Sequence, residues 1–178
     1  FGILQIDAHC DLRKAFEGFE HSHASIMYNA LTKLPLKKLV QVGIRDFCEE
    51  EHRMIAKEKK RIHTTFDRDL ANWKQAGKSW KKMVQSVIRP LPKHVYISFD
   101  IDGLDPALCP HTGTPVPGGL TFNEATSFLE AIVESGRIIV GFDLNEVAPG
   151  KEGDWDANVG GRMLFKLCGW MLRSHKKA

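Results

Sequence analysis

Ile3-Leu4-Gln5-Ile6-Asp7-Ala8-His9-Cys10-Asp11 places a short apolar run directly before two aspartates and a histidine spaced two residues apart. Val95-Tyr96-Ile97-Ser98-Phe99-Asp100-Ile101-Asp102 repeats this pattern much later in the chain. Each apolar run is predicted to form a strand, and successive side chains of a strand alternate between its two faces. The acidic and histidine side chains of each run can therefore point the same way. The sequence predicts two acid-rich strand ends in one sheet.

Other short, apolar and β-branched segments extend this prediction to five strands. They lie at roughly 2–7, 38–44, 61–66, 94–100 and 137–143. Helical patterns separate them, and an alternation of strands and helices predicts a three-layer α/β/α domain with a mostly parallel sheet. Ligands of such sheets gather beyond the carboxyl ends of the strands, which is where both acid-rich runs lie.

Three helices are predicted from the spacing of apolar residues. One long helix is expected over 67–88, and another over 122–135, where Thr121 and Glu124 form a capping box and Gly136 supplies the stop. The last helix is expected to carry one apolar stripe: Met163, Leu164, Leu167, Cys168, Met171 and Leu172.

Four carboxylates and one imidazole converging at strand ends would repel one another without a cation. Oxygen and nitrogen ligands without a thiolate favour a hard or borderline ion such as Mn²⁺. Two such ions about 3.5–4 Å apart can share a hydroxide and act together as Lewis acids. Cys10 is expected to face the other way and to pack. Taken alone, residues 7–11 could also be a strand-end turn with a hydrogen-bonded histidine.

Composition predicts one globular domain spanning residues 1–178, with 43% hydrophobic residues and a net charge of +3. The basic residues are scattered among acids, which indicates solvated helix faces and no nucleic-acid partner. Four cysteines without a close pair indicate reduced thiols. Because we find neither a membrane-spanning run nor a secretory signal, we expect a cytoplasmic protein without a membrane partner.

The chain resembles the ureohydrolase family of arginases, agmatinases, formiminoglutamases and guanidino-acid hydrolases. The motifs that carry the resemblance occur in family order and cover nearly the whole chain. They are Asp7–Asp11, Ser22–Ser25, Ser98–Pro106, Thr112–Pro115, Gly118–Leu120 and Asp143–Pro149.

This resemblance implies a site with two Mn²⁺ ions per subunit. Asp7 and Asp100 would bridge the ions, Asp11 would complete the shell of one, and His9 with Asp102 that of the other. The fold implied is arginase-like, and the family suggests a homo-oligomer, a trimer or a hexamer.

The resemblance also implies roles for three further residues. Glu146 would receive the guanidinium group of a small substrate through a charge-assisted pair. His23 would shuttle the proton to the departing amine, with His21 as a rival that we assign to a surface loop. Thr114 would line the pocket and orient the bound group, or be a simple turn hydroxyl. Hydrolysis would release urea and an amine.

The substrate favoured is agmatine, which gives urea and putrescine and a place in polyamine biosynthesis. Arginases carry asparagine and serine groups in the loop that corresponds to Leu12–Glu20, and an acid at the position of Cys48; both are missing here. Arginine, formiminoglutamate and guanidino acids stay open as substrates. Arg45 and Asp46 are expected to form a structural ion pair.

One family motif has no counterpart in this chain. The family supplies another metal-binding histidine from an upstream Gly-Gly-Asp-His motif, together with N-terminal strands and helices. The chain is therefore expected to be the C-terminal portion of a complete enzyme, with one unprotected edge of its sheet. A truncated product is the competing explanation, and a non-catalytic metal-binding or assembly subunit is the alternative function.

Overall fold

Five parallel strands form one sheet in the computed structural model, which describes residues 1–150 and 153–176. The strand order is β3-β2-β1-β4-β5. All five strands predicted from the sequence are present, each within two residues of its expected ends. Their bounds are β1 Gly2–Ile6, β2 Lys38–Ile44, β3 Ile62–Phe66, β4 His94–Asp100 and β5 Ile138–Asn145.

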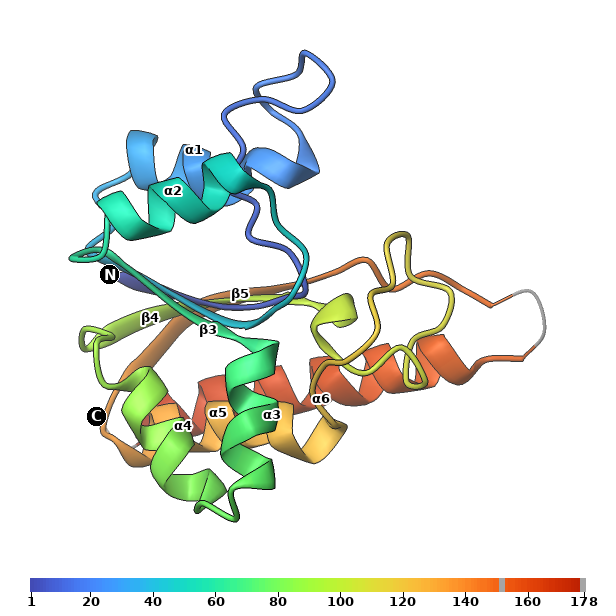
Figure 1. The fold of residues 1–178 in the computed structure, drawn as a ribbon. Coiled ribbons are helices and arrows are strands. Elements are labelled where there is room, and N and C mark those ends of the chain that lie inside the picture. Colours follow the sequence, from blue (N-terminus) through green and yellow to red (C-terminus); the bar gives the residue numbers. More distant parts are fainter. Residues whose placement is uncertain (151–152, 177–178) are drawn as a thin grey trace.

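Helices cover both faces of the sheet, which confirms the predicted three-layer α/β/α architecture (Figure 1). One face is covered by α1 (Ile26–Lys33) and α2 (Glu49–Lys57). The other face is covered by α3 (Asp67–Gln75), α4 (Trp80–Ile88), α5 (Phe122–Glu134) and α6 (Trp155–Lys176). Two short 3-10 turns, η1 (His23–Ser25) and η2 (Ile101–Gly103), complete the elements.

The single helix predicted over 67–88 is wrong, because the chain breaks into α3 and α4. Gly77 adopts a left-handed backbone with φ 63°, which ends the first helix. The Ser79 hydroxyl then accepts a hydrogen bond from the Lys82 backbone N–H and caps the second. The apolar spacing runs through the break because both helices bury residues, Leu70 and Val84, against the same face of the sheet.

The prediction for α5 is confirmed at both ends. Thr121 and Glu124 form the reciprocal capping box, and Gly136 has φ 79° just beyond the last turn. The helix thus begins and ends where local sequence chemistry places its caps.

The stripe predicted on α6 is only half covered. Met163 and Leu167 are fully buried, whereas Leu164 and Leu172 are 45% and 66% exposed. The reason is the position of the sheet, which ends at β5 beneath this helix. Val140 of β5 is also exposed. β5 is an edge strand of this sheet, and the expectation that one edge lacks its family partners stays a prediction.

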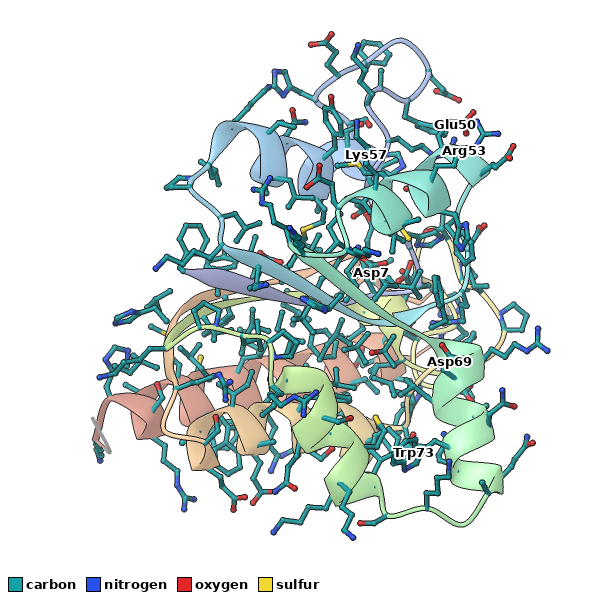
Figure 2. The ribbon with its side chains drawn as sticks, turned by 60° about the vertical axis from the view of Figure 1, so that its left-hand side comes forward. Asp7, Glu50, Arg53, Lys57, Asp69 and Trp73 are labelled. Atoms are coloured by element: carbon teal, nitrogen blue, oxygen red, sulfur yellow. The ribbon has the colours of Figure 1, made fainter. Side chains whose placement is uncertain are left out.

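The outer face of α2 is polar. Figure 2 shows Glu50, Arg53 and Lys57 along the solvent side of α2, whereas Asp7 lies inside the molecule at the sheet. Among residues 1–150 and 153–176, no helix has the length and apolar character needed to cross a bilayer.

Candidate metal centre

The two acid-rich runs leave neighbouring strands at the same edge of the sheet. β1 and β4 pair in parallel, with Ile6 opposite Phe99, so Asp7 and Asp100 follow on adjacent strands. Strand alternation does not continue beyond Ile6, however. Asp11 adopts φ 54°, and this turn, rather than a strand, brings it back to the site.

Gly103 allows the two runs to approach closely. A Cβ at this position would lie 2.7 Å from the backbone nitrogen of Asp7 and 3.0 Å from its Cα. Any larger residue would push η2 away from the end of β1. The glycine after Asp102 therefore sets the spacing of the site.

One cavity of about 180 Å³ gathers every candidate residue of the sequence analysis. Its lining includes Asp7, His9, Asp11, His23, Asp100, Asp102, Thr114 and Glu146. The rival His21 is exposed and does not line it. The fold thus brings the candidate residues together, while their individual roles stay predictions.

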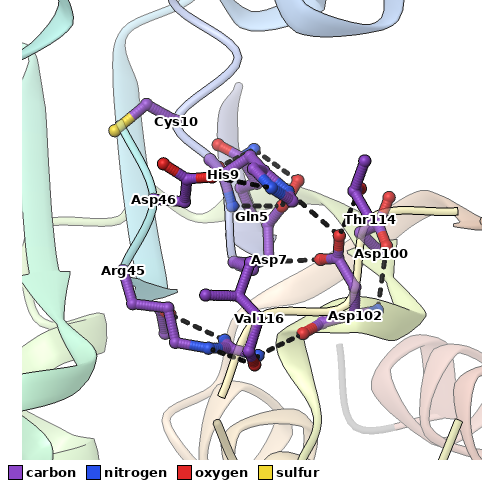
Figure 3. Close-up of polar contacts among 12 residues, drawn as sticks. Gln5, Asp7, His9, Cys10, Arg45, Asp46, Asp100, Asp102, Thr114 and Val116 are labelled. Carbon is purple, nitrogen blue, oxygen red and sulfur yellow. Dashed lines mark hydrogen bonds and ion pairs between the residues drawn. The ribbon is translucent and has the colours of Figure 1, made fainter. Parts of the chain in front are cut away.

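Asp7, His9 and Asp102 form the tightest group, with one ligand atom of each within 4.8 Å of the others (Figure 3). His9 Nδ1 lies 2.9 Å from Asp102 Oδ2 and 3.5 Å from Asp7 Oδ1. Backbone amides hold both carboxylates: the Ala8 N–H donates to Asp102 Oδ1, and the His9 N–H donates to Asp7 Oδ1. Cys10 points away into the apolar cluster beneath α1, as predicted.

The acids of this site are crowded. Burial and the neighbouring Asp7 raise the pKa of Asp11 to about 9 and the pKa of Asp100 to about 9. Burial also raises the pKa of Asp7 to about 6. For His9, burial disfavours the imidazolium, but hydrogen bonds to Asp102 and Asp7 outweigh it and raise the pKa to about 10.

Burial is the largest cause of the raised carboxylate pKa values, and repulsion between neighbouring carboxylates adds to it, whereas hydrogen bonds from His9 and Ala8 lower the pKa of Asp102. A divalent ion would offset this repulsion and replace the protons. Carboxylate oxygens with one imidazole nitrogen are a donor set that suits Mn²⁺. The residues present therefore fit a manganese centre.

The substrate side of the cavity is formed by loops. Thr114 Oγ1 lies 3.3 Å from Asp102 Oδ2. Glu146 stands just past β5 with φ 61°, and its Oε2 lies so near Gly113 that a Cβ there would be 3.1 Å away. His23 is exposed in η1 and meets the Phe16 ring edge-on at 5.4 Å.

The expected ion pair between Arg45 and Asp46 is wrong. The Arg45 guanidinium donates instead to backbone carbonyls, including those of Asp102 at 2.6 Å and Val116 at 2.9 Å. Asp46 lies on the other side, with Oδ2 3.8 Å from His9 Nε2. Arg45 thus connects the end of β2 to η2 and to the loop that carries Thr114 through hydrogen bonds. Its position in the sequence does not predict this role.

Comparison with known proteins matches residues 1–169 to the model of the arginase family. The chain is 33% identical over 177 residues to N(1)-aminopropylagmatine ureohydrolase of Synechocystis sp., covering 99% of this chain and 54% of the relative. It is 37% identical over 153 residues to the protein of the same name from Thermus thermophilus, covering 84% of this chain and 47% of that relative.

Among solved structures, agmatine ureohydrolase of Thermoplasma volcanium superposes with a TM-score of 0.80 at 28% identity. That match covers 99% of this chain and 56% of the solved chain. The chain thus spans about half the length of the relatives it matches.

Proposed function

Because the chain belongs to the arginase family, we propose that it carries the manganese-binding and guanidinium-binding residues of a ureohydrolase. The observation that supports this most strongly is the single cavity lined by all eight candidate residues. They come from segments as distant as Asp7 and Glu146. A structural role would not require so many acids to share one partly buried cavity.

In this proposal the five ligands divide between two ions as the family resemblance implies. Asp7 and Asp100 would hold both ions, Asp11 one, and His9 with Asp102 the other. When bound, the ions supply Lewis acidity and lower the pKa of water toward neutrality. Because hydrogen bonds to Asp102 and Asp7 outweigh burial and raise the pKa of His9 to about 10, the imidazole would have to release a proton to become a ligand.

The remaining residues serve the substrate. Glu146, at the rim of the cavity, would pair with the guanidinium and hold its carbon above the metal ligands. Hydrolysis breaks one C–N bond of the guanidinium, and water provides the urea oxygen. His23 would pass a proton to the leaving nitrogen, which departs as an ammonium ion. The positive charge of the substrate thus leaves with the amine.

We propose agmatine as the substrate, since Cys48 stands where arginases carry the acid that recognises the substrate's α-amino group. Cys48 is the N-cap of α2, and its backbone N–H donates to Glu51 Oε2 at 2.8 Å. N(1)-aminopropylagmatine is the second candidate, because two similar relatives bear names that specify it. We further propose a cytoplasmic homo-oligomer, a trimer or a hexamer.

A urea-release assay with manganese tests this function. Agmatine, N(1)-aminopropylagmatine, arginine, guanidinobutyrate and formiminoglutamate are offered to the protein expressed from its complete gene. We expect urea from agmatine, or from its aminopropyl derivative, and none from arginine. Preference for arginine would overturn the substrate assignment. Bound Mn²⁺ without urea from any compound would instead favour a non-catalytic metal-binding subunit.

The variant Asp100→Asn tests the bridging assignment in the same assay. It should abolish manganese-dependent urea release, because one shared ligand oxygen is lost. Asp69→Asn, an exposed aspartate on α3, is the matched control and should keep full activity. Near-normal turnover by Asp100→Asn would refute the assignment.

A further inference from the structure

A row of polar side chains crosses the whole sheet just below the metal centre. Each strand contributes one residue at the same register, and strand pairing sets their order: Thr64, Gln41, Gln5, Ser98 and Asp143. Gln5 and Gln41 are completely buried. Two residues farther along β1 and β4 stand the candidate ligands Asp7 and Asp100, so this row directly supports the site.

Three members of the row form a continuous hydrogen-bond chain that ends on Asp7. The Thr64 hydroxyl donates to Gln41 Oε1 at 2.7 Å, and Gln41 Nε2 donates to Gln5 Oε1 at 2.7 Å. Gln5 Nε2 then donates to Asp7 Oδ2 at 2.8 Å. We call Thr64, Gln41 and Gln5 the polar relay.

The direction of the polar relay is determined by its surroundings. Gln5 Nε2 faces two acceptors, Asp7 Oδ2 and the His9 carbonyl at 3.2 Å. Gln41 Nε2 likewise faces the Cys10 carbonyl at 2.8 Å. Turning either amide over would set oxygen against oxygen in a buried site. The three side-chain hydrogen bonds of the polar relay therefore all run in one direction and end on Asp7.

The other half of the row is separate. Ser98 donates its hydroxyl to Asp143 Oδ1 at 3.1 Å, and Asn145 donates to the same oxygen. Ser98 is nearly buried, on the same face and at the same register as Gln5. Its hydrogen bond thus ends on a residue that is not a candidate ligand, which makes it a natural control.

We propose that the polar relay positions the Asp7 carboxylate for manganese. It would hold Oδ2 through the amide nitrogen of Gln5, which can only donate, so that the carboxylate cannot rotate and its remaining lone pairs face the cavity. Hydrogen-bonding partners of a metal ligand commonly orient it in this way. This inference rests on the proposed function, because it needs Asp7 to be a ligand.

Manganese affinity of the protein expressed from its complete gene provides the test. Free Mn²⁺ is followed by electron paramagnetic resonance during titration of Gln5→Met, Gln41→Met, Thr64→Val and Ser98→Ala. Thermal unfolding without metal reports whether each variant folds. We expect Gln5→Met to weaken Mn²⁺ binding about 10–100-fold. The loss should be smaller for Gln41→Met and smallest for Thr64→Val, while Ser98→Ala binds as the wild type does.

The outcomes separate this proposal from the proposed function. If wild type and Gln5→Met bind Mn²⁺ equally, the positioning role is wrong and the metal centre stands. Equal losses in Gln5→Met and Ser98→Ala would also overturn it, since they indicate a general packing effect. If Gln5→Met does not fold, the Mn²⁺ affinities of Thr64→Val and Ser98→Ala are compared instead. Weaker binding by Thr64→Val than by Ser98→Ala supports the positioning role, and equal binding overturns it. A wild type that binds no Mn²⁺ refutes the proposed function, and this inference with it.

Discussion

Asp11 and Glu146 share an unusual backbone conformation. Both have positive φ, 54° and 61°, although neither is glycine, and both line the same cavity. A left-handed conformation costs about 1–2 kcal/mol for an ordinary side chain. Strain of this kind persists where the surrounding structure enforces it, and it gathers at functional sites. Two of the three such residues in the described part of the chain line the candidate site, whereas the third, Glu17, does not.

Replacing Asp11 should increase the stability of the metal-free protein and weaken its metal binding. Asparagine tolerates the left-handed backbone and carries no charge. In the wild type, burial and the neighbouring Asp7 disfavour the charged carboxylate and raise the pKa of Asp11 to about 9. At pH 7 we therefore expect Asp11→Asn to raise the thermal midpoint of the metal-free protein and to weaken Mn²⁺ binding. Thermal unfolding and metal titration check this, with Asp69→Asn unchanged in both. A variant that binds Mn²⁺ normally would exclude Asp11 as a ligand.

The break between α3 and α4 depends on one glycine. Gly77 has φ 63°, and nothing lies within 4 Å of a Cβ added there. A substitution therefore meets backbone strain and no clash. Gly161, within α6, offers equally open space in a helical conformation. The two positions allow the effect of backbone conformation to be measured alone.

Gly77→Ala and Gly161→Ala should change stability in opposite directions. The first forces alanine into the left-handed region and should lower the free energy of unfolding by about 1 kcal/mol. The second replaces glycine inside a helix and should raise it by about 1 kcal/mol. Urea denaturation of both variants checks the pair. Stabilisation by Gly77→Ala would show that a continuous helix over 67–88 is accessible after all.

The charge of the site affects the whole molecule. Burial and neighbouring carboxylates raise the pKa of Asp11 and of Asp100 from the ordinary 3.8 to about 9, so the metal-free folded state holds protons that the unfolded chain releases. Their contribution to stability is complete below about pH 4 and is lost as the pH rises toward 9. His9 acts in the same direction between about pH 6.5 and 10.

We therefore expect the thermal midpoint of the metal-free wild type to decrease as the pH is raised from 5 to 9, and to decrease more than that of the Asp11→Asn variant. Added Mn²⁺ should raise the midpoint, and by more at higher pH, because the ligands must lose their protons to bind. Scanning calorimetry with and without manganese measures both trends. A larger stabilisation by Mn²⁺ at pH 5 than at pH 8 would contradict this assignment of the acids.

Much of this architecture follows from the sequence alone. Short β-branched runs determined the five strands, and the capping box with Gly136 determined α5. The parallel arrangement then placed Asp7 and Asp100 together, because parallel strands present their carboxyl ends at one edge. These features depend on local patterns or on a general property of the fold, and therefore a single sequence is enough to predict them.

Only the tertiary structure decided the contacts that depend on strand register. Gln5 and Gln41 are 36 positions apart, so no local pattern shows that they share a hydrogen bond. Nor does a local pattern show that the polar relay ends on Asp7. The role of Arg45 is hidden for the same reason, since its acceptors lie in a distant loop. Side-chain hydrogen bonds across strands arise from how the backbone is folded together, and this information is absent from the spacing of residue types.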